Sequence, residues 1–370
     1  MKITQVEALH LRLPKVAEVA DGTQDCLLVQ VSTDAGLTGL GEVVSCSYVA
    51  RAVVEAPRSA PFRHGLAAIV RGMDPSAIDE VLQAMIAGTS WYGPGGIARH
   101  TMSGIDMALW DICAKAADKP LRTLLSDDAV DQIPCYASVL WPERPEQVAA
   151  SAQDFLEQGY RAVKYGWAPM GPDLEMDVAL VAAARQALGT EVELMVDAGR
   201  VWNAAAALER IERFEAYGIS WLEEPLAPYD IDGYQELSLA SPIPIAAGEI
   251  MTLEEEYKNL IENGGIHVVQ PDLGRVGGIS GGQHIAALAR RAKARPVPHA
   301  YGTGVLLAAA AQWTAAGPDP LTEFTRSPSP LARDLVRCAM DFKDGLLHLH
   351  DAPGLGVELN EEIVAKYRVA

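Results

Sequence analysis

The sequence predicts an α/β protein in which a barrel of parallel strands follows a smaller α+β region. From about residue 126 to residue 326, short apolar segments alternate with longer segments of helical periodicity. Such alternation is typical of a parallel sheet whose strands are joined by helices. There are eight apolar segments, and that number fits a closed barrel better than an open sheet.

The segments of the predicted barrel can be placed along the chain. We expect helices between the strands, for example over 147–158, 174–188 and 279–292. The expected strands cover 133–138, 162–167, 193–199, 221–225, 245–249, 268–272, 296–300 and 322–326.

The regions on either side of the barrel differ from it in pattern. Residues 1–125 begin with three strand-like segments, at 3–13, 26–33 and 39–44, and continue into helical periodicity, which predicts an α+β domain. Residues 327–370 are rich in proline and glycine. We expect this tail to pack back on the N-terminal domain and to add a strand to it around its HLH segment.

Composition and charge restrict the class of protein. The chain has 370 residues, of which 49% are hydrophobic and 21% charged, and it contains no apolar run long enough to cross a bilayer. The first residues alternate like a strand and do not form a secretory signal, so we expect a cytoplasmic protein. The five cysteines are dispersed, which argues against a disulfide framework and a structural zinc site.

The net charge of −19 disfavours two kinds of partner, nucleic acid and anionic membrane, because both would be repelled. A small anionic substrate would need a local positive centre, such as a divalent metal, to offset the field of the protein.

Ionisable residues stand at the ends of six successive predicted strands, 23 to 27 residues apart, which is about the length of one strand–helix unit. A single acid after a strand usually caps the next helix. Six in phase instead predict a site at the C-terminal rim of the barrel, where barrel enzymes place their chemistry. These residues are Asp197, Glu223, Glu249, Asp272, His299 and Glu323.

The first three of these residues are carboxylates on neighbouring strands. Without a cation, Asp197, Glu223 and Glu249 would repel one another and raise each other's pKa. Oxygen ligands suit Mg²⁺, and the absence of cysteine or histidine among the three makes zinc less favoured. The sequence therefore predicts a Mg²⁺ site.

Asp272 and His299 end the next two strands. A carboxylate bonded to one imidazole nitrogen orients the ring and makes the other nitrogen more basic. If His299 did not share the regular spacing of the other strand-end residues, we would interpret it as a structural histidine, as we do the other histidines of the barrel and tail. The pair is our candidate for the general base.

The ordered motifs SGIDMALWDICAKAADKPL, YRAVKYG, MVDAG, WLEEPLAP, AAGE, QPDLGRVGG and PHAYGTG resemble the mandelate racemase group of the enolase superfamily over nearly the whole chain. The resemblance implies an α+β capping domain over a (β/α)7β barrel. It implies that Asp197, Glu223 and Glu249 bind Mg²⁺ and that Asp272 and His299 form the acid/base dyad. It implies that Glu323 faces the substrate carboxylate, to which it would donate a hydrogen bond if protonated, and that Glu224 is a less favoured metal ligand.

The resemblance also implies that cap loops around 14–23 and 46–57 close over the site, and that the chain forms a homo-oligomer, a dimer or an octamer.

The sequence departs from the usual family pattern at two positions. The family often has Lys-x-Lys on its second barrel strand, whereas this chain has Lys164-Tyr165-Gly166; Lys164 is left to contact the substrate carboxylate, unless it is a surface or helix-capping lysine. Gly199 stands where an asparagine is common.

The missing second lysine decides between reactions. We expect His299 to remove the proton next to a carboxylate through an enediolate and then to assist loss of the β-hydroxyl, which converts an aldonate or aldarate to a 2-keto-3-deoxy acid. The alternatives are a racemase or epimerase of a 2-hydroxy acid or amino acid derivative, with Tyr165, Tyr92 or a cap residue as second base, and a non-catalytic ligand-binding barrel. A cycloisomerase is less favoured, because that group typically keeps lysines on opposite faces.

Overall fold

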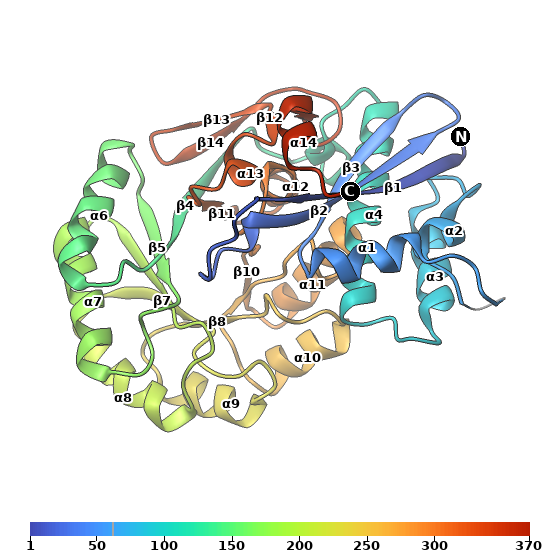
Figure 1. Cartoon of the computed structure of the whole chain (residues 1–370). Helices are drawn as coiled ribbons and strands as arrows, with labels where there is room; N and C mark the ends of the chain where they lie inside the picture. Colours follow the sequence, from blue (N-terminus) through green and yellow to red (C-terminus); the bar gives the residue numbers. More distant parts are fainter. Residues whose placement is uncertain (61–62) are drawn as a thin grey trace.

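The computed structural model describes residues 1–60 and 63–370, and it confirms the predicted fold class: an α+β cap beside a (β/α)7β barrel (Figure 1). Each barrel strand from β4 to β9 pairs in parallel with the next, up to β10, and β11 pairs in parallel with β4. The strands are β4 (Gln132–Leu140), β5 (Ala162–Gly166), β6 (Glu193–Asp197), β7 (Ile219–Glu223), β8 (Ile245–Ala247), β9 (Val268–Val269), β10 (Arg295–Pro296) and β11 (Thr322–Thr325).

One long helix follows each strand from β4 to β10 and packs outside the barrel. The last of them, α12, is buried along its whole length, which agrees with its alanine-rich sequence. The helices are α6 (Val148–Glu157), α7 (Leu174–Leu188), α8 (Ala204–Phe214), α9 (Ile231–Ala240), α10 (Glu254–Glu262), α11 (Gly278–Arg291) and α12 (Gly304–Ala315).

A layer of apolar side chains, one from each strand or its flank, fills the barrel interior. Because side chains alternate across a strand, the residue two positions further along each strand also points inward, one layer closer to the C-terminal mouth. The apolar layer thus fixes which residues reach the mouth. Its members are Tyr136, Ala162, Met195, Trp221, Ala246, Val268, Val297 and Leu321.

The cap consists of a three-stranded antiparallel sheet and the helices packed on it. Its first two strands are joined by the segment that reaches toward the barrel mouth in Figure 1. The elements are β1 (Ile3–Arg12), η1 (Gly22–Gln24), β2 (Asp25–Thr33), β3 (Thr38–Val43), α1 (Ser47–Glu55), α2 (Leu66–Val70), α3 (Ile78–Thr89), α4 (Ile97–Ala116) and α5 (Leu121–Leu125).

The C-terminal tail behaves differently from the expectation in one respect. The first two residues of the HLH segment, His348 and Leu349, lie in β14, which pairs with the start of barrel strand β4 and not with the cap sheet. The tail nevertheless packs back on the cap, as expected: the Leu355 amide donates to Asp111 on α4 at 2.8 Å, and the Val369 amide donates to the His10 carbonyl at 2.8 Å. The tail elements are α13 (Pro330–Arg333), β12 (Val336–Cys338), β13 (Met340–Lys343), β14 (Leu346–Leu349), β15 (Val357–Leu359) and α14 (Glu361–Tyr367).

No helix within 1–60 and 63–370 combines the length and the apolar character that a bilayer crossing requires.

Buried polar contacts join the cap to the barrel. From β3, the Glu42 carboxylate accepts hydrogen bonds from the Thr303 amide (2.9 Å), the Thr303 hydroxyl (2.6 Å) and the Leu306 amide (3.0 Å), so it caps the N-terminus of α12. Burial raises the pKa of Glu42 to about 7, although these hydrogen bonds oppose the shift.

We expect Glu42 to make folding stability depend on pH. Its pKa is higher in the folded than in the unfolded chain, so its contribution is complete below the unfolded value of 4.5 and is lost as pH rises through about 7. Glu42→Gln should reduce the fall in unfolding free energy between pH 5 and pH 8 by about 2 kcal/mol, measured by urea unfolding. Glu55→Gln, on the exposed side of α1, is the control; equal pH slopes in Glu42→Gln and wild type would contradict the assignment.

Candidate active site

The structure brings the predicted rim residues together at the C-terminal mouth of the barrel. Most of them lie two positions beyond the apolar interior layer, and the strand ladder pairs Gly166 with Asp197 and Asp197 with Glu223. The resulting ring of buried or nearly buried polar side chains consists of Ser138, Lys164, Asp197, Glu223, Gln270, His299 and Glu323.

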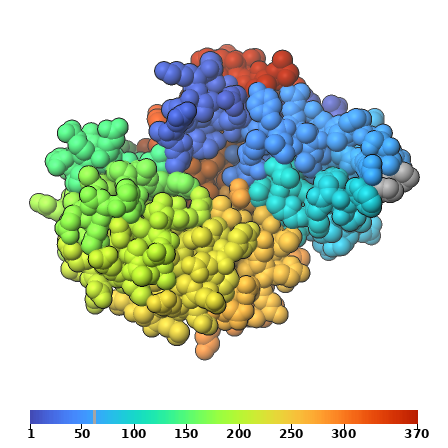
Figure 2. All heavy atoms as spheres, turned by 60° about the horizontal axis from the view of Figure 1, so that its bottom comes forward, coloured from blue at the N-terminus to red at the C-terminus, as the bar shows by residue number. Residues whose placement is uncertain are grey.

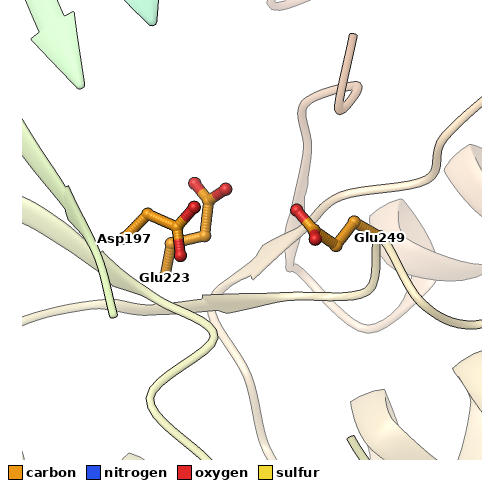
Figure 3. A group of neighbouring side chains, drawn as sticks. All are labelled: Asp197, Glu223 and Glu249. Carbon is orange, nitrogen blue, oxygen red and sulfur yellow. The ribbon is translucent and has the colours of Figure 1, made fainter. Parts of the chain in front are cut away.

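Three buried carboxylates converge in this ring. Asp197 and Glu223 lie side by side, and Glu249 points toward them from the other side (Figure 3). One oxygen of each lies within 4.8 Å of the others. Burial, and after it the charge of Glu223, raise the pKa of Asp197 well above its ordinary value. An all-oxygen donor set that is strained by like charges fits a hard divalent cation.

Neighbouring donors orient the carboxylate of Glu223. Its Oε2 accepts hydrogen bonds from Gln270 Nε2 at 2.6 Å and from the Trp221 indole at 3.0 Å, while its Oε1 pairs with Lys164. Glu249 follows Gly248, whose φ of +132° is one that side chains rarely allow. Such fixed partners hold ligand oxygens in place before a cation arrives.

Two cations border the carboxylates. Lys164, which is 2% exposed, also lies 3.0 Å from Glu323 Oε1. Arg200 Nη1 lies 3.1 Å from Glu224 Oε2 and 3.2 Å from Glu249 Oε1. Glu224 is therefore held by Arg200 and lies outside the group of three.

Asp272 and His299 are in contact, joined by a bridge that extends β9 and β10. His299 Nδ1 lies 2.7 Å from Asp272 Oδ2, which leaves Nε2 facing the cavity, 3.3 Å from Glu249 Oε2. Burial disfavours the charged ring, but the carboxylates of Glu249, Glu323 and Asp272 outweigh it and raise the pKa of His299 to about 10. Removing the charge of Glu249 would make the ring a free base at lower pH.

Glu323 accepts a hydrogen bond from the Ala300 amide at 2.6 Å. Burial would raise its pKa, but the Lys164 and His299 charges lower it to about 2. The side chain is thus ionised in this arrangement, and it would donate a hydrogen bond only after a bound substrate anion had raised its pKa.

A cavity of about 350 Å³ lies above the ring, between barrel and cap. Figure 2 shows the cap residues, in blue, lying against the barrel residues, in green to orange. The predicted loop 14–23 contributes Val19, Ala20, Asp21 and Gly22 to the cavity wall. The predicted loop 46–57 does not, because most of it forms helix α1; Val44, just before it, lines the cavity instead.

At Gly166, where the family often has a second lysine, the structure leaves no room for a side chain. A side chain at Gly166 would put its Cβ 2.7 Å from Asp197 Cβ and 2.9 Å from Asp197 Oδ2. Neither tyrosine considered as a substitute base lines the cavity: Tyr165 is buried against Trp141, and Tyr92 is 45% exposed on the cap.

Gly166→Ala should therefore disturb the carboxylate group. We expect Asp197 to shift and Mg²⁺ binding to weaken about tenfold, measured by calorimetric titration. Gly22→Ala is a matched control, because Gly22 lines the same cavity but has open space around it. Unchanged Mg²⁺ affinity in Gly166→Ala would count against the link between this glycine and the ligand geometry.

Several residues of the site were missed by the sequence analysis. Ser138 and Gln270 are uncharged, yet the two-residue period from Tyr136 and Val268 points to both. Arg200, Arg275 and Tyr301 also line the cavity, but they lie after strand ends, where no periodicity applies.

The protein is a barrel with buried carboxylates and a histidine at its mouth, next to an α+β cap. Comparison of its sequence with known families shows which family has this architecture. Residues 2–126 match the mandelate racemase/muconate lactonizing enzyme N-terminal domain, and residues 147–363 match the enolase C-terminal domain-like family. The chain belongs to the mandelate racemase group of the enolase superfamily.

Individual relatives span most of the chain. It is 31% identical to the D-galactarolactone cycloisomerase of Agrobacterium fabrum, over 100% of this chain and 99% of that one. It is 33% identical to the L-talarate/galactarate dehydratase of Salmonella typhimurium, over 79% and 71% of the two chains. The crystal structure of the 3,6-anhydro-D-galactonate cycloisomerase from Zobellia galactanivorans superposes with a TM-score of 0.90 at 27% identity, covering 100% of both chains.

Proposed function

We propose that this protein is a Mg²⁺-dependent lyase that removes the proton next to the carboxylate of a sugar acid and eliminates water, giving a 2-keto-3-deoxy acid. The observation that carries the proposal is the contact between His299 and Asp272 beside three converging carboxylates. A relative named as a dehydratase of talarate and galactarate supports the same substrate class.

Each residue has a proposed part in the reaction. Asp197, Glu223 and Glu249 would hold the divalent ion, which when bound draws negative charge from the substrate carboxylate. Lys164 and Glu323 would position that carboxylate. Asp272 keeps His299 Nδ1 protonated, so Nε2 takes the proton from the carbon and then returns it to the departing oxygen.

The closed position at Gly166 favours elimination over racemisation. A racemase needs a base on each face of the carbon, whereas an elimination can proceed with a single residue that acts first as base and then as acid. Among the residues described in the cavity wall, the tyrosines proposed as second base are absent. Loss of a β-oxygen on the side of His299 is compatible with this arrangement.

A second candidate differs only in the leaving group. Two full-length matches are named cycloisomerases, one of a lactone and one of a 3,6-anhydro acid. In a 3,6-anhydro sugar acid the ring oxygen is attached to the carbon β to the carboxylate, so its expulsion opens the ring and yields an isomer. This reaction needs the same base and does not need a second lysine.

A keto-acid assay tests the proposal. Sugar acids, lactones and anhydro acids are incubated with protein and Mg²⁺, and 2-keto products are trapped with semicarbazide. Keto product from an open-chain acid with loss of one water in mass supports dehydration, and keto product of unchanged mass supports ring opening. Deuterium incorporation from D₂O at the α-carbon without keto product would instead favour a racemase, and neither signal would favour a non-catalytic barrel.

A further inference from the structure

The geometry points to Arg275 as the binding group for a second carboxylate of the substrate, so we infer that the preferred substrates are dicarboxylic sugar acids or their lactones. This inference rests on the proposed function, because it concerns the far end of the same substrate. It assigns Arg275 to specificity and not to the chemical step.

Charge pairing in the cavity sets Arg275 apart. The other basic side chains of the wall are matched by acids: Lys164 by Glu223 and Glu323, Arg200 by Glu224 and Glu249, and His299 by Asp272. Within the ranges 1–60 and 63–370, Arg275 has no acidic side chain within ion-pair distance. In a protein of net charge −19, an unmatched arginine in a ligand cavity marks a place for negative charge brought by the ligand.

The contacts of Arg275 leave most of its guanidinium unused. Nη1 donates to the Val44 carbonyl at 3.0 Å, and Nε is buried with no hydrogen-bond acceptor among the described residues. Nearby His100 is neutral, because burial, and after it the charge of Arg275, lower its pKa to about 3. The acid Asp21 on the cap segment is occupied by hydrogen bonds from Thr23 and Ser327.

The position of Arg275 suits the far end of a substrate. It follows Asp272 by three residues in the loop after β9, and its Nη1 contacts Val44, the residue after cap strand β3, at the boundary of cap and barrel. Lys164 and Glu323, proposed to hold the first carboxylate, lie in the ring on β5 and β11. A guanidinium can bind a carboxylate with two parallel hydrogen bonds, which a hydroxymethyl group cannot replace.

Galactarate and D-galactonate provide a matched test, because they differ only in a carboxylate or a hydroxymethyl group at C6. We expect wild type to prefer the diacid, and Arg275→Met to lower kcat/KM for galactarate about 10- to 100-fold while changing that for galactonate less than about twofold. Arg99→Met is the control: Arg99 also crosses from cap to barrel, donating to the Thr252 carbonyl, but does not line the cavity. It should leave the ratio of the two substrates unchanged.

Three results would overturn the inference: a wild-type preference for galactonate, an equal loss for both acids in Arg275→Met, or the same change of ratio in Arg99→Met. If wild type converts neither acid, the keto-acid assay on the other sugar acids, lactones and anhydro acids decides the proposed function, and binding decides the inference separately. With Mg²⁺ present, galactarate should then raise the melting temperature of wild type more than galactonate does. In Arg275→Met the two acids should raise it equally. Equal stabilisation by the two acids would overturn it.

Discussion

His299→Asn is expected to lower turnover about a thousandfold, which is the scale of a lost general base. The amide can still face Asp272, but it cannot take a proton from carbon. Because His299 is not one of the three proposed ligands, the fold should be preserved, and Mg²⁺ should bind no more weakly than to wild type, since a charge that competes for Glu249 is removed. Deuterium exchange at the α-carbon in D₂O measures the proton-abstraction step directly and should fall with turnover.

A control separates this effect from the loss of any histidine. His284 lies exposed on α11, outside the cavity, so His284→Asn should retain wild-type activity. Normal exchange by His299→Asn, with Mg²⁺ still bound, would mean that another residue is the base.

The barrel could be predicted from sequence because its evidence is local. Each strand is a short apolar run between helical segments, and the charged residue that ends it repeats at the length of one strand–helix unit. The strands β8, β9 and β10 are shorter than expected, since the chain leaves the regular ladder before it reaches Glu249, Asp272 and His299. These side chains reach the site from strand ends and not from within strands.

Long-range pairing was the part that sequence could not provide. The strand β14 has an alternating pattern that suits any exposed edge, and only the folded chain shows that it joins β4. The helix over most of residues 46–57 was missed for another reason: Ser47, Ala50 and Val54 stand at helical spacing, but the resemblance suggested a loop there. The reason for Gly166 was also hidden, because the conflict with Asp197 depends on the spacing of two neighbouring strands.

Glu249→Gln should affect metal and proton transfer together, because one carboxylate borders both. One of its oxygens lies within 4.8 Å of an oxygen of Asp197 and of Glu223, and its Oε2 lies 3.3 Å from His299 Nε2. We expect Mg²⁺ affinity to fall about a hundredfold, measured by calorimetric titration. In the metal-free protein, the pKa of His299 should fall from about 10, because the charge that does most to favour the imidazolium is gone.

Mg²⁺ binding should lower the pKa of His299 in wild type, as Glu249→Gln does in the metal-free protein. A bound cation offsets the charge of Glu249, so the pKa of His299, followed by NMR of the labelled ring, should decrease when Mg²⁺ is added. The ring is then neutral and able to act as a base at a pH where the metal-free ring is protonated. Glu224→Gln is the matched control, since Glu224 shares Arg200 with Glu249 but lies outside the group of three. An equal loss of Mg²⁺ affinity in both variants would reject Glu249 as a ligand, and an unmoved His299 pKa would reject its coupling to the metal site.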